Sequence, residues 1–161
     1  MQSATLRGRR GIDYAHAVPA QARGWRLVLD KPGLIPMGDS FANIIPDPAA
    51  TVWGVLYQID AADLDHIDLT EGVLIGNYAR IEIAVQPPGA ASAIGAFTLV
   101  SERRDPRLQP STRYMGLLIS GAEEHGLPAD YVAFLRSIPA RPESPEVAQL
   151  RPFIDDALRR R

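Results

Sequence analysis

Residues 51–78, TVWGVLYQIDAADLDHIDLTEGVLIGNY, contain the features that decide the fold. The segment 51–59 is rich in β-branched and aromatic residues and is apolar on both faces, which predicts a central strand covered on both sides. Asp60 can cap a short helix after this strand. Gly72 directly follows Glu71 and lets the chain leave the helix. The stretch therefore predicts a strand, a helix, and a break that places one carboxylate at the helix end.

The chain around this stretch divides into a strand-rich first part and a helical second part. Proline and glycine in residues 31–40 predict a loop, and Pro46 and Pro48 are expected to stop the strand that precedes them. No strand is expected before residue 24. Alternation of apolar and polar residues predicts strands at residues 24–30 and 78–85, and a short apolar run predicts one at 41–45. A further strand is expected at residues 92–100, paired with 78–85 in a hairpin.

Helical spacing of apolar residues predicts three helices in the second part. They are expected to begin at Ser111, Pro128 and Ser144. Strands followed by helices predict an α+β fold with a mostly antiparallel, barrel-like sheet. With 161 residues, the chain is expected to form a single domain spanning residues 1–161.

Composition and charge exclude several classes of protein. The chain has no cysteine, which excludes disulfides, thiolate metal sites and a cysteine nucleophile. A net charge of −2 argues against a nucleic-acid binder, so the arginines at 7–10 and 159–161 are interpreted as a solvated turn and a helix C-terminus. No apolar run or leader pattern predicts a membrane span or secretion, and we expect a cytoplasmic protein.

Few residues offer recognisable chemistry. No nucleophile elbow, phosphate-binding loop or dinucleotide glycine pattern is present in the sequence. Asp63 and His66 share a helix but lack a third ligand in a known arrangement, so we interpret them as part of a solvated acidic face. Glu71 remains, and the apolar residues beside it would form a collar that favours the neutral form of a carboxyl and suits a general acid/base. The alternative is an exposed glutamate in a turn. The expected collar consists of Leu69, Val73, Leu74 and Ile75.

The order of short segments resembles the γ-glutamylcyclotransferase (AIG2-like) family between residues 22 and 138. Segments such as Val-Trp-Gly-Val, Glu-Gly-Val and Gly-Leu-Pro are weak singly and specific together. The matching segments are ARGWRL at 22–27, FANI at 41–44, VWGVLY at 52–57, EGV at 71–73, GNY at 76–78, PS at 110–111 and GAEEHGLP at 121–128.

The resemblance implies a reaction and its site residues. This family cyclises a γ-glutamyl group, releasing 5-oxoproline and a free amine or amino acid, without cofactor or metal. Its catalytic glutamate matches Glu71, a substrate-contacting tyrosine matches Tyr114, and Tyr78 occupies a position that lines the pocket. Core or cross-strand packing remains the alternative for both tyrosines. The implied partner is a small γ-glutamyl substrate, with no nucleic acid and no membrane. A homodimer and the leaving amine stay open.

Two departures separate this chain from the family pattern. Phe97 stands where relatives often carry a tyrosine. The family's first strand, with its substrate-binding Tyr-Gly-Ser-Asn loop, is absent, because Met1 and Gln2 align just after that tetrapeptide. We expect the first strand to be missing, either because the coding start lies upstream or because the chain is a catalytically impaired relic or binding module. From their place in this alignment, Met1 and Gln2 are expected to contact the substrate.

Overall fold

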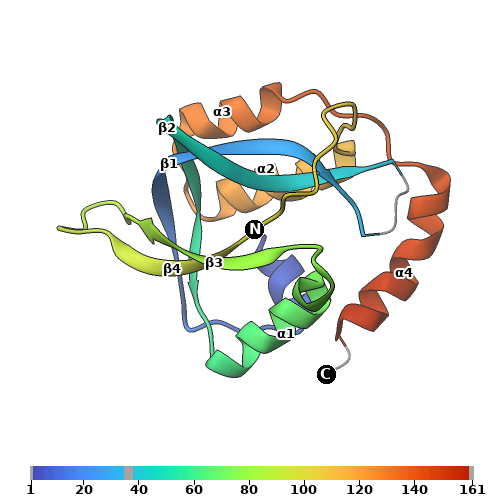
Figure 1. The fold of residues 1–161 in the computed structure, drawn as a ribbon, viewed down its shortest axis with the longest axis horizontal. Helices are drawn as coiled ribbons and strands as arrows, with labels where there is room; N and C mark the ends of the chain where they lie inside the picture. The colour runs from blue at the N-terminus through green and yellow to red at the C-terminus, as the bar shows by residue number, and fades with distance from the viewer. Residues whose placement is uncertain (1, 35–37, 160–161) are drawn as a thin grey trace.

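One long antiparallel hairpin organises the fold, and the computed structural model describes it within residues 2–34 and 38–159 (Figure 1). Strand β1, His16–Pro32, pairs with strand β2, Ser40–Gln58, from His16 opposite Gln58 to Pro32 opposite Ser40. Two expectations are corrected here. A strand does precede residue 24, and residues 41–45 and 51–59 belong to one continuous strand.

A large irregularity explains why prolines do not interrupt β2. The register changes from Arg23 opposite Thr51 to Trp25 opposite Pro46, so residues 47–50 lie opposite Gly24 alone. Gly24 has a φ of 80°, which a glycine adopts without strain. Pro48 lies within this bulge, where no ladder hydrogen bond is lost, and Pro46, opposite Trp25, directly borders it.

A second antiparallel pair lies against the hairpin. Strand β3, Ala79–Val85, pairs with β4, Ile94–Val100, and a bridge between Gln21 and Gln86 connects the two ladders. The ladders do not close into a barrel in the described residues. The expected α+β class with antiparallel strands is confirmed, and the sheet is open.

Helical segments surround these strands. A π-helical turn, η1 (Thr5–Arg9), precedes β1, and the described residues 2–15 contain no strand. Helix α1 (Ala61–Glu71) and the 3-10 turn η2 (Val73–Ile75) connect β2 to β3. The later helices are α2 (Thr112–Glu124), α3 (Ala129–Ser137) and α4 (Pro145–Arg159).

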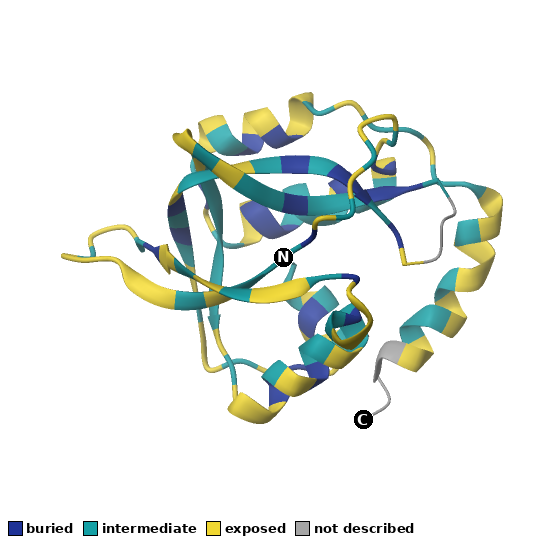
Figure 2. Ribbon diagram, in the orientation of Figure 1, coloured by how far each residue is buried: buried dark blue, intermediate teal, exposed yellow. Residues whose placement is uncertain are grey.

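The hairpin is covered on both faces, as the sequence of β2 predicts. Trp53 and Val55 pack against the buried residues of α2 and α3, whereas Leu56 packs toward β3 and β4. Figure 2 shows buried positions along the hairpin and on the helix faces turned toward it. Within the described residues, no helix is long and apolar enough to cross a membrane.

Candidate active site

Glu71 lies at the last position of α1, and Gly72 is what allows the chain to turn there. Gly72 has a φ of 71°, and its N–H donates to the carbonyls of Asp68 and Leu69. A Cβ at this position would lie 3.0 Å from the Cβ of Asn77. Both the left-handed backbone and the close approach of Asn77 therefore require glycine.

The carboxylate of Glu71 forms an ion pair with the guanidinium of Arg10, which follows η1. The side chains are 20% and 13% exposed, so the pair is largely shielded from water. Arg10 also donates from NH1 to Thr70 Oγ1 at 3.2 Å. His66 holds the Arg10 backbone, because its Nε2 and the Arg10 carbonyl are 3.1 Å apart. Helix α1 thus fixes both the acid and its counterion.

These contacts correct three expectations. The prediction of an apolar collar is wrong, since Leu69, Leu74 and Ile75 are 62%, 83% and 69% exposed to solvent. The interpretation of Asp63 and His66 as part of a solvated acidic face is also wrong, because these two are the buried residues of α1. The interpretation of residues 7–10 as a solvated turn holds for exposed Arg7 but not for Arg10.

A buried lysine lies on the other side of Glu71. Lys31, expected in a loop, is the penultimate residue of β1 and is 2% exposed. Its ammonium donates to Asn77 Oδ1 at 2.6 Å, and NH1 of Arg103 donates to the same oxygen at 2.7 Å. Asn77 Nδ2 in turn donates to the Glu71 carbonyl at 2.8 Å. One amide therefore connects two cations to the end of α1.

Burial and two neighbouring charges set the pKa of Lys31. Desolvation and the charge of Arg103 lower this pKa, the charge of Glu71 opposes the shift, and the net value is about 8. Within the described residues no carboxylate lies within ion-pair distance of Lys31. The ammonium also lies 4.3 Å from the centre of the Tyr78 ring, a cation–π contact.

Tyr78 and Tyr114 meet at one backbone unit of β2. Tyr78 donates from its hydroxyl to the Ala42 carbonyl at 3.2 Å, and the Ala42 N–H donates to the Tyr114 hydroxyl at 3.1 Å. Burial raises the pKa of Tyr78, and the neighbouring Tyr114 and Glu71 add to this rise while Arg10 opposes it. The structure thus brings both sequence-predicted tyrosines to the surroundings of Glu71.

The other sequence-predicted positions lie elsewhere. Gln2 donates its side-chain amide to Ser120 of α2 at 3.0 Å, and the described contacts include none between Gln2 and Glu71. Met1 lies outside the described residues. Phe97 is 56% exposed on β4, with the Arg80 guanidinium 5.2 Å from its ring centre. That Gln2 lines the substrate site stays a prediction.

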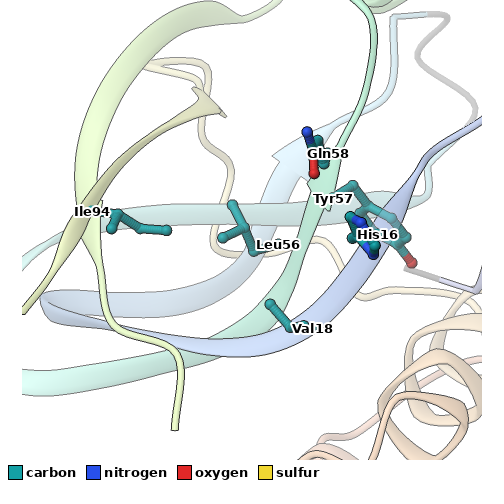
Figure 3. A pocket seen from close by; sticks show the side chains of 6 residues that line it. All are labelled: His16, Val18, Leu56, Tyr57, Gln58 and Ile94. Atoms are coloured by element: carbon teal, nitrogen blue, oxygen red, sulfur yellow. The ribbon is translucent and has the colours of Figure 1, made fainter. Parts of the chain in front are cut away.

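A separate hollow of about 340 Å³ lies between the hairpin and the start of β4 (Figure 3). It shares no lining residue with the Glu71 cluster. On its far side the Tyr57 hydroxyl lies 2.9 Å from His125 Nε2, and Ser3 Oγ lies 3.2 Å from the same nitrogen. Burial raises the pKa of Tyr57 and lowers that of His125. The hollow is lined by His16, Val18, Leu56, Tyr57, Gln58 and Ile94.

Comparison with known proteins places the chain among its relatives. The model of the AIG2-like family matches residues 51–135, more than half of the chain. The chain belongs to the AIG2-like family. The matched region includes the end of β2 from residue 51, the whole of α1, and Glu71, Tyr78 and Tyr114.

Several relatives of this AIG2-like chain carry the name γ-glutamylcyclotransferase. The proteins of that name from Bos taurus and Homo sapiens are 33% and 32% identical over 98 residues, covering 60% of this chain and 50% of theirs. A γ-glutamyl cyclotransferase from Aspergillus oryzae is 29% identical and covers 84% of this chain and 57% of its own length. The chain thus spans about half the length of the curated relatives that it matches.

Solved structures agree on the fold. A structure named γ-glutamyl cyclotransferase has a TM-score of 0.78 at 22% identity, covering 98% of this chain and 91% of its own. The structure of an uncharacterized Homo sapiens protein has a TM-score of 0.79 at 23% identity, with the same coverage. At this identity the likeness shows a shared fold.

Sequence reasoning missed the cations that surround Glu71. Arg10 lies in an arginine-rich turn and could not be distinguished from its neighbours by sequence. Arg103 follows β4 and belongs to no recognisable sequence motif. Lys31 carries a usable signal, because it is the only lysine in a chain with sixteen arginines. Asn77 lies within the Gly-Asn-Tyr segment that carried the family resemblance. The contacts of these cations join residues 26 to 61 positions apart in the chain, so no local sequence pattern reveals them.

Proposed function

We propose that this chain cyclises a γ-glutamyl group, releasing 5-oxoproline and a free amine or amino acid, with Glu71 as the acid/base. The observation that carries the proposal is the placement of Glu71. The glutamate that matches the family's catalytic residue is a shielded carboxylate near Tyr78, and Tyr78 shares the Ala42 backbone with Tyr114, the other tyrosine that the resemblance assigns to the site. Membership of the AIG2-like family and relatives named γ-glutamylcyclotransferase support the reaction class.

The proposed reaction uses only groups of the substrate and one carboxylate. Glu71 accepts a proton from the substrate's α-ammonium, and the freed amine attacks the γ-carbonyl carbon. A new carbon–nitrogen bond closes the five-membered ring, and the attacking nitrogen gives up its second proton as the bond to the leaving nitrogen breaks. The leaving nitrogen takes up both protons in turn through Glu71 and departs as an ammonium. Atoms and charge balance without a cofactor or metal. Most of the acceleration comes from holding the substrate folded.

The surroundings of Glu71 suit this role in two ways. Partial burial removes competing water, so a proton passes between carboxylate and bound substrate with little exchange to solvent. Tyr78 and Tyr114 offer aromatic walls, and their hydroxyls are both engaged with Ala42, which fixes the ring positions. In this proposal the two rings hold the glutamyl chain bent beside the carboxylate.

The test is release of 5-oxoproline from γ-glutamyl-alanine by the wild type and by Glu71→Gln. We expect Glu71→Gln to lose at least about a hundredfold in turnover, because an amide cannot carry the proton. Glu146→Gln, an exposed glutamate of α4, is the matched control and should retain activity. Circular dichroism and a melting curve establish that each variant folds. Undiminished activity in Glu71→Gln rules out the mechanism, and an inactive wild type that still binds 5-oxoproline favours a binding module.

A further inference from the structure

Asn77 closes the turn that follows Glu71 at the end of α1. Its side-chain Nδ2 donates to the Glu71 carbonyl at 2.8 Å, and its backbone N–H donates to the Gly72 carbonyl at 2.9 Å. The carbonyls of the last helical turn have no partner within the helix, so they depend on groups outside it. Asn77 is 4% exposed, and Ser101 Oγ donates to its carbonyl at 2.8 Å. The residue is therefore fixed from several sides while it holds the end of the helix.

Two cations determine which way the Asn77 amide points. Lys31 and Arg103 both donate to its Oδ1, and an ammonium and a guanidinium carry donors only. The oxygen must face them, because the flipped amide would place its NH2 group against two positively charged donors. Nδ2 then faces the Glu71 carbonyl. The two cations thus select the orientation in which the amide supports the proposed catalytic residue.

A neutral amide at this position is unfavourable for charge and required for the hydrogen bonds. An aspartate would give buried Lys31 and half-buried Arg103 an anion, and hydrogen bonds between charged groups are the stronger kind. A carboxylate has no N–H, however, so it would face the Glu71 carbonyl with an oxygen in place of a donor. The amide of Asn77 both accepts from the cations and donates to that carbonyl.

The contacts of Asn77 also reach the segment that anchors the two tyrosines. Ser101, which donates to Asn77, exchanges two hydrogen bonds with Asn43, of 2.9 Å from its N–H and 2.7 Å to its carbonyl. Asn43 directly follows Ala42, whose backbone binds the hydroxyls of both tyrosines. A displacement of Asn77 therefore changes the position of the Glu71 carboxylate relative to the aromatic walls of the site.

We propose that Asn77 is a positioning residue, whose amide holds the end of α1 so that the Glu71 carboxylate keeps its place for the cyclisation. This inference rests on the proposed function. Lys31 and Arg103 act through Asn77 by orienting its amide. Position matters because most of the acceleration of a cyclisation comes from geometry, and a displacement of about 1 Å costs about a hundredfold in rate.

The experiment is Asn77→Asp, which keeps an acceptor for both cations and removes the donor to the Glu71 carbonyl. With γ-glutamyl-alanine, we expect kcat to fall by about 10- to 100-fold across the pH range, with KM changed by less than about threefold. The melting temperature should stay equal or rise, since two hydrogen bonds become ion pairs. Gln86→Glu, at the opposite end of β3, removes a similar amide donor to the Ala90 carbonyl and should leave kcat unchanged.

Three results overturn the role of Asn77 and leave the reaction standing. The first is an unchanged kcat in Asn77→Asp. The second is a fall in kcat together with a fall in melting temperature, which a merely structural role would produce. The third is a loss that disappears at another pH, because a new charge near Glu71 shifts the pH–rate profile, whereas a misplaced carboxylate lowers kcat throughout.

If the wild type releases no 5-oxoproline, the proposed function fails, and hydrogen exchange then tests this inference separately. Asn77→Asp should speed exchange of the Gly72 and Ile75 amides, which close the turn after α1, by about tenfold. The amides of α2 should keep their protection. This local loosening supports the role of Asn77 in holding the end of α1, and unchanged exchange at Gly72 and Ile75 overturns it.

Discussion

Lys31 provides a direct test of the electrostatics at the site, because the chain contains no other lysine. Labelling lysine at Cε and Nζ gives one side-chain NMR signal, whose pH titration reports the pKa of Lys31 without ambiguity. We expect a midpoint of about 8 in place of the ordinary 10.5. The physical reason is burial of the ammonium beside Arg103, only partly offset by Glu71.

The shift also predicts how stability changes with pH. Between the folded and unfolded pKa values of Lys31, the unfolded chain binds more protons than the folded chain, so stability rises with pH in this window. From a pKa of about 8 in the folded state and 10.5 in the unfolded state, the gain between pH 7 and about pH 9.5 is about 2 kcal/mol. Below pH 7 this group adds nothing to the slope, because both states carry the proton.

The assay is urea unfolding of the wild type and of Lys31→Met at both pH values. Subtracting the variant removes contributions from the N-terminal amine and from other groups that titrate in this range. We expect the wild type to gain about 2 kcal/mol more than the variant over this interval. A midpoint near 10.5 together with parallel pH dependence of the two proteins would refute the account of Lys31 as a buried, unpaired cation.

Two further predictions concern the turn after α1 and the contact near the hollow. Gly72→Ala should lower the free energy of unfolding by about 1–2 kcal/mol, because alanine disfavours the left-handed backbone conformation of this residue. Gly116→Ala, at a helical position with free space around it, should raise the free energy of unfolding by about 0.5–1 kcal/mol. Chemical denaturation measures both, and equal effects of the two substitutions would contradict the role of Gly72. Burial lowers the pKa of His125, so below its ordinary value of 6.5 the unfolded chain binds more protons and stability falls as pH drops. Unfolding at pH 7 and 5 should show a steeper loss in the wild type than in His125→Gln, and identical slopes would exclude this histidine as the cause.

The spacing of apolar residues and the positions of capping and breaking residues were enough to predict the main helices and strands. The two-sided apolar pattern of residues 51–59 predicts a covered strand, and Trp53 and Leu56 indeed face opposite layers. Ser111 caps α2 through a hydrogen bond from the Tyr114 N–H, as the helix-start pattern indicates. These features depend on neighbours a few residues apart, which is the range over which side-chain periodicity acts.

The length of the hairpin was not predicted from the sequence, because two prolines in β2 indicated an early end of the strand. Pro46 and Pro48 lack an N–H and ordinarily end a strand. Pro48 lies in the bulge opposite Gly24, where no ladder donor is needed, and Pro46 borders the bulge, so the strand continues. A bulge depends on how β2 pairs with β1, so it cannot be predicted from the local sequence of β2.

The sequence by itself determined the α+β class, the end of α1 at Glu71 and the family resemblance, because each rests on local pattern or on an ordered set of segments. Only the tertiary structure decided the environment of Glu71. A carboxylate expected among apolar neighbours is paired with Arg10 and lies near Lys31, while those neighbours face solvent. Charge acts through space and depends on which distant segments pack together, so it follows from the fold and not from the adjacent residues.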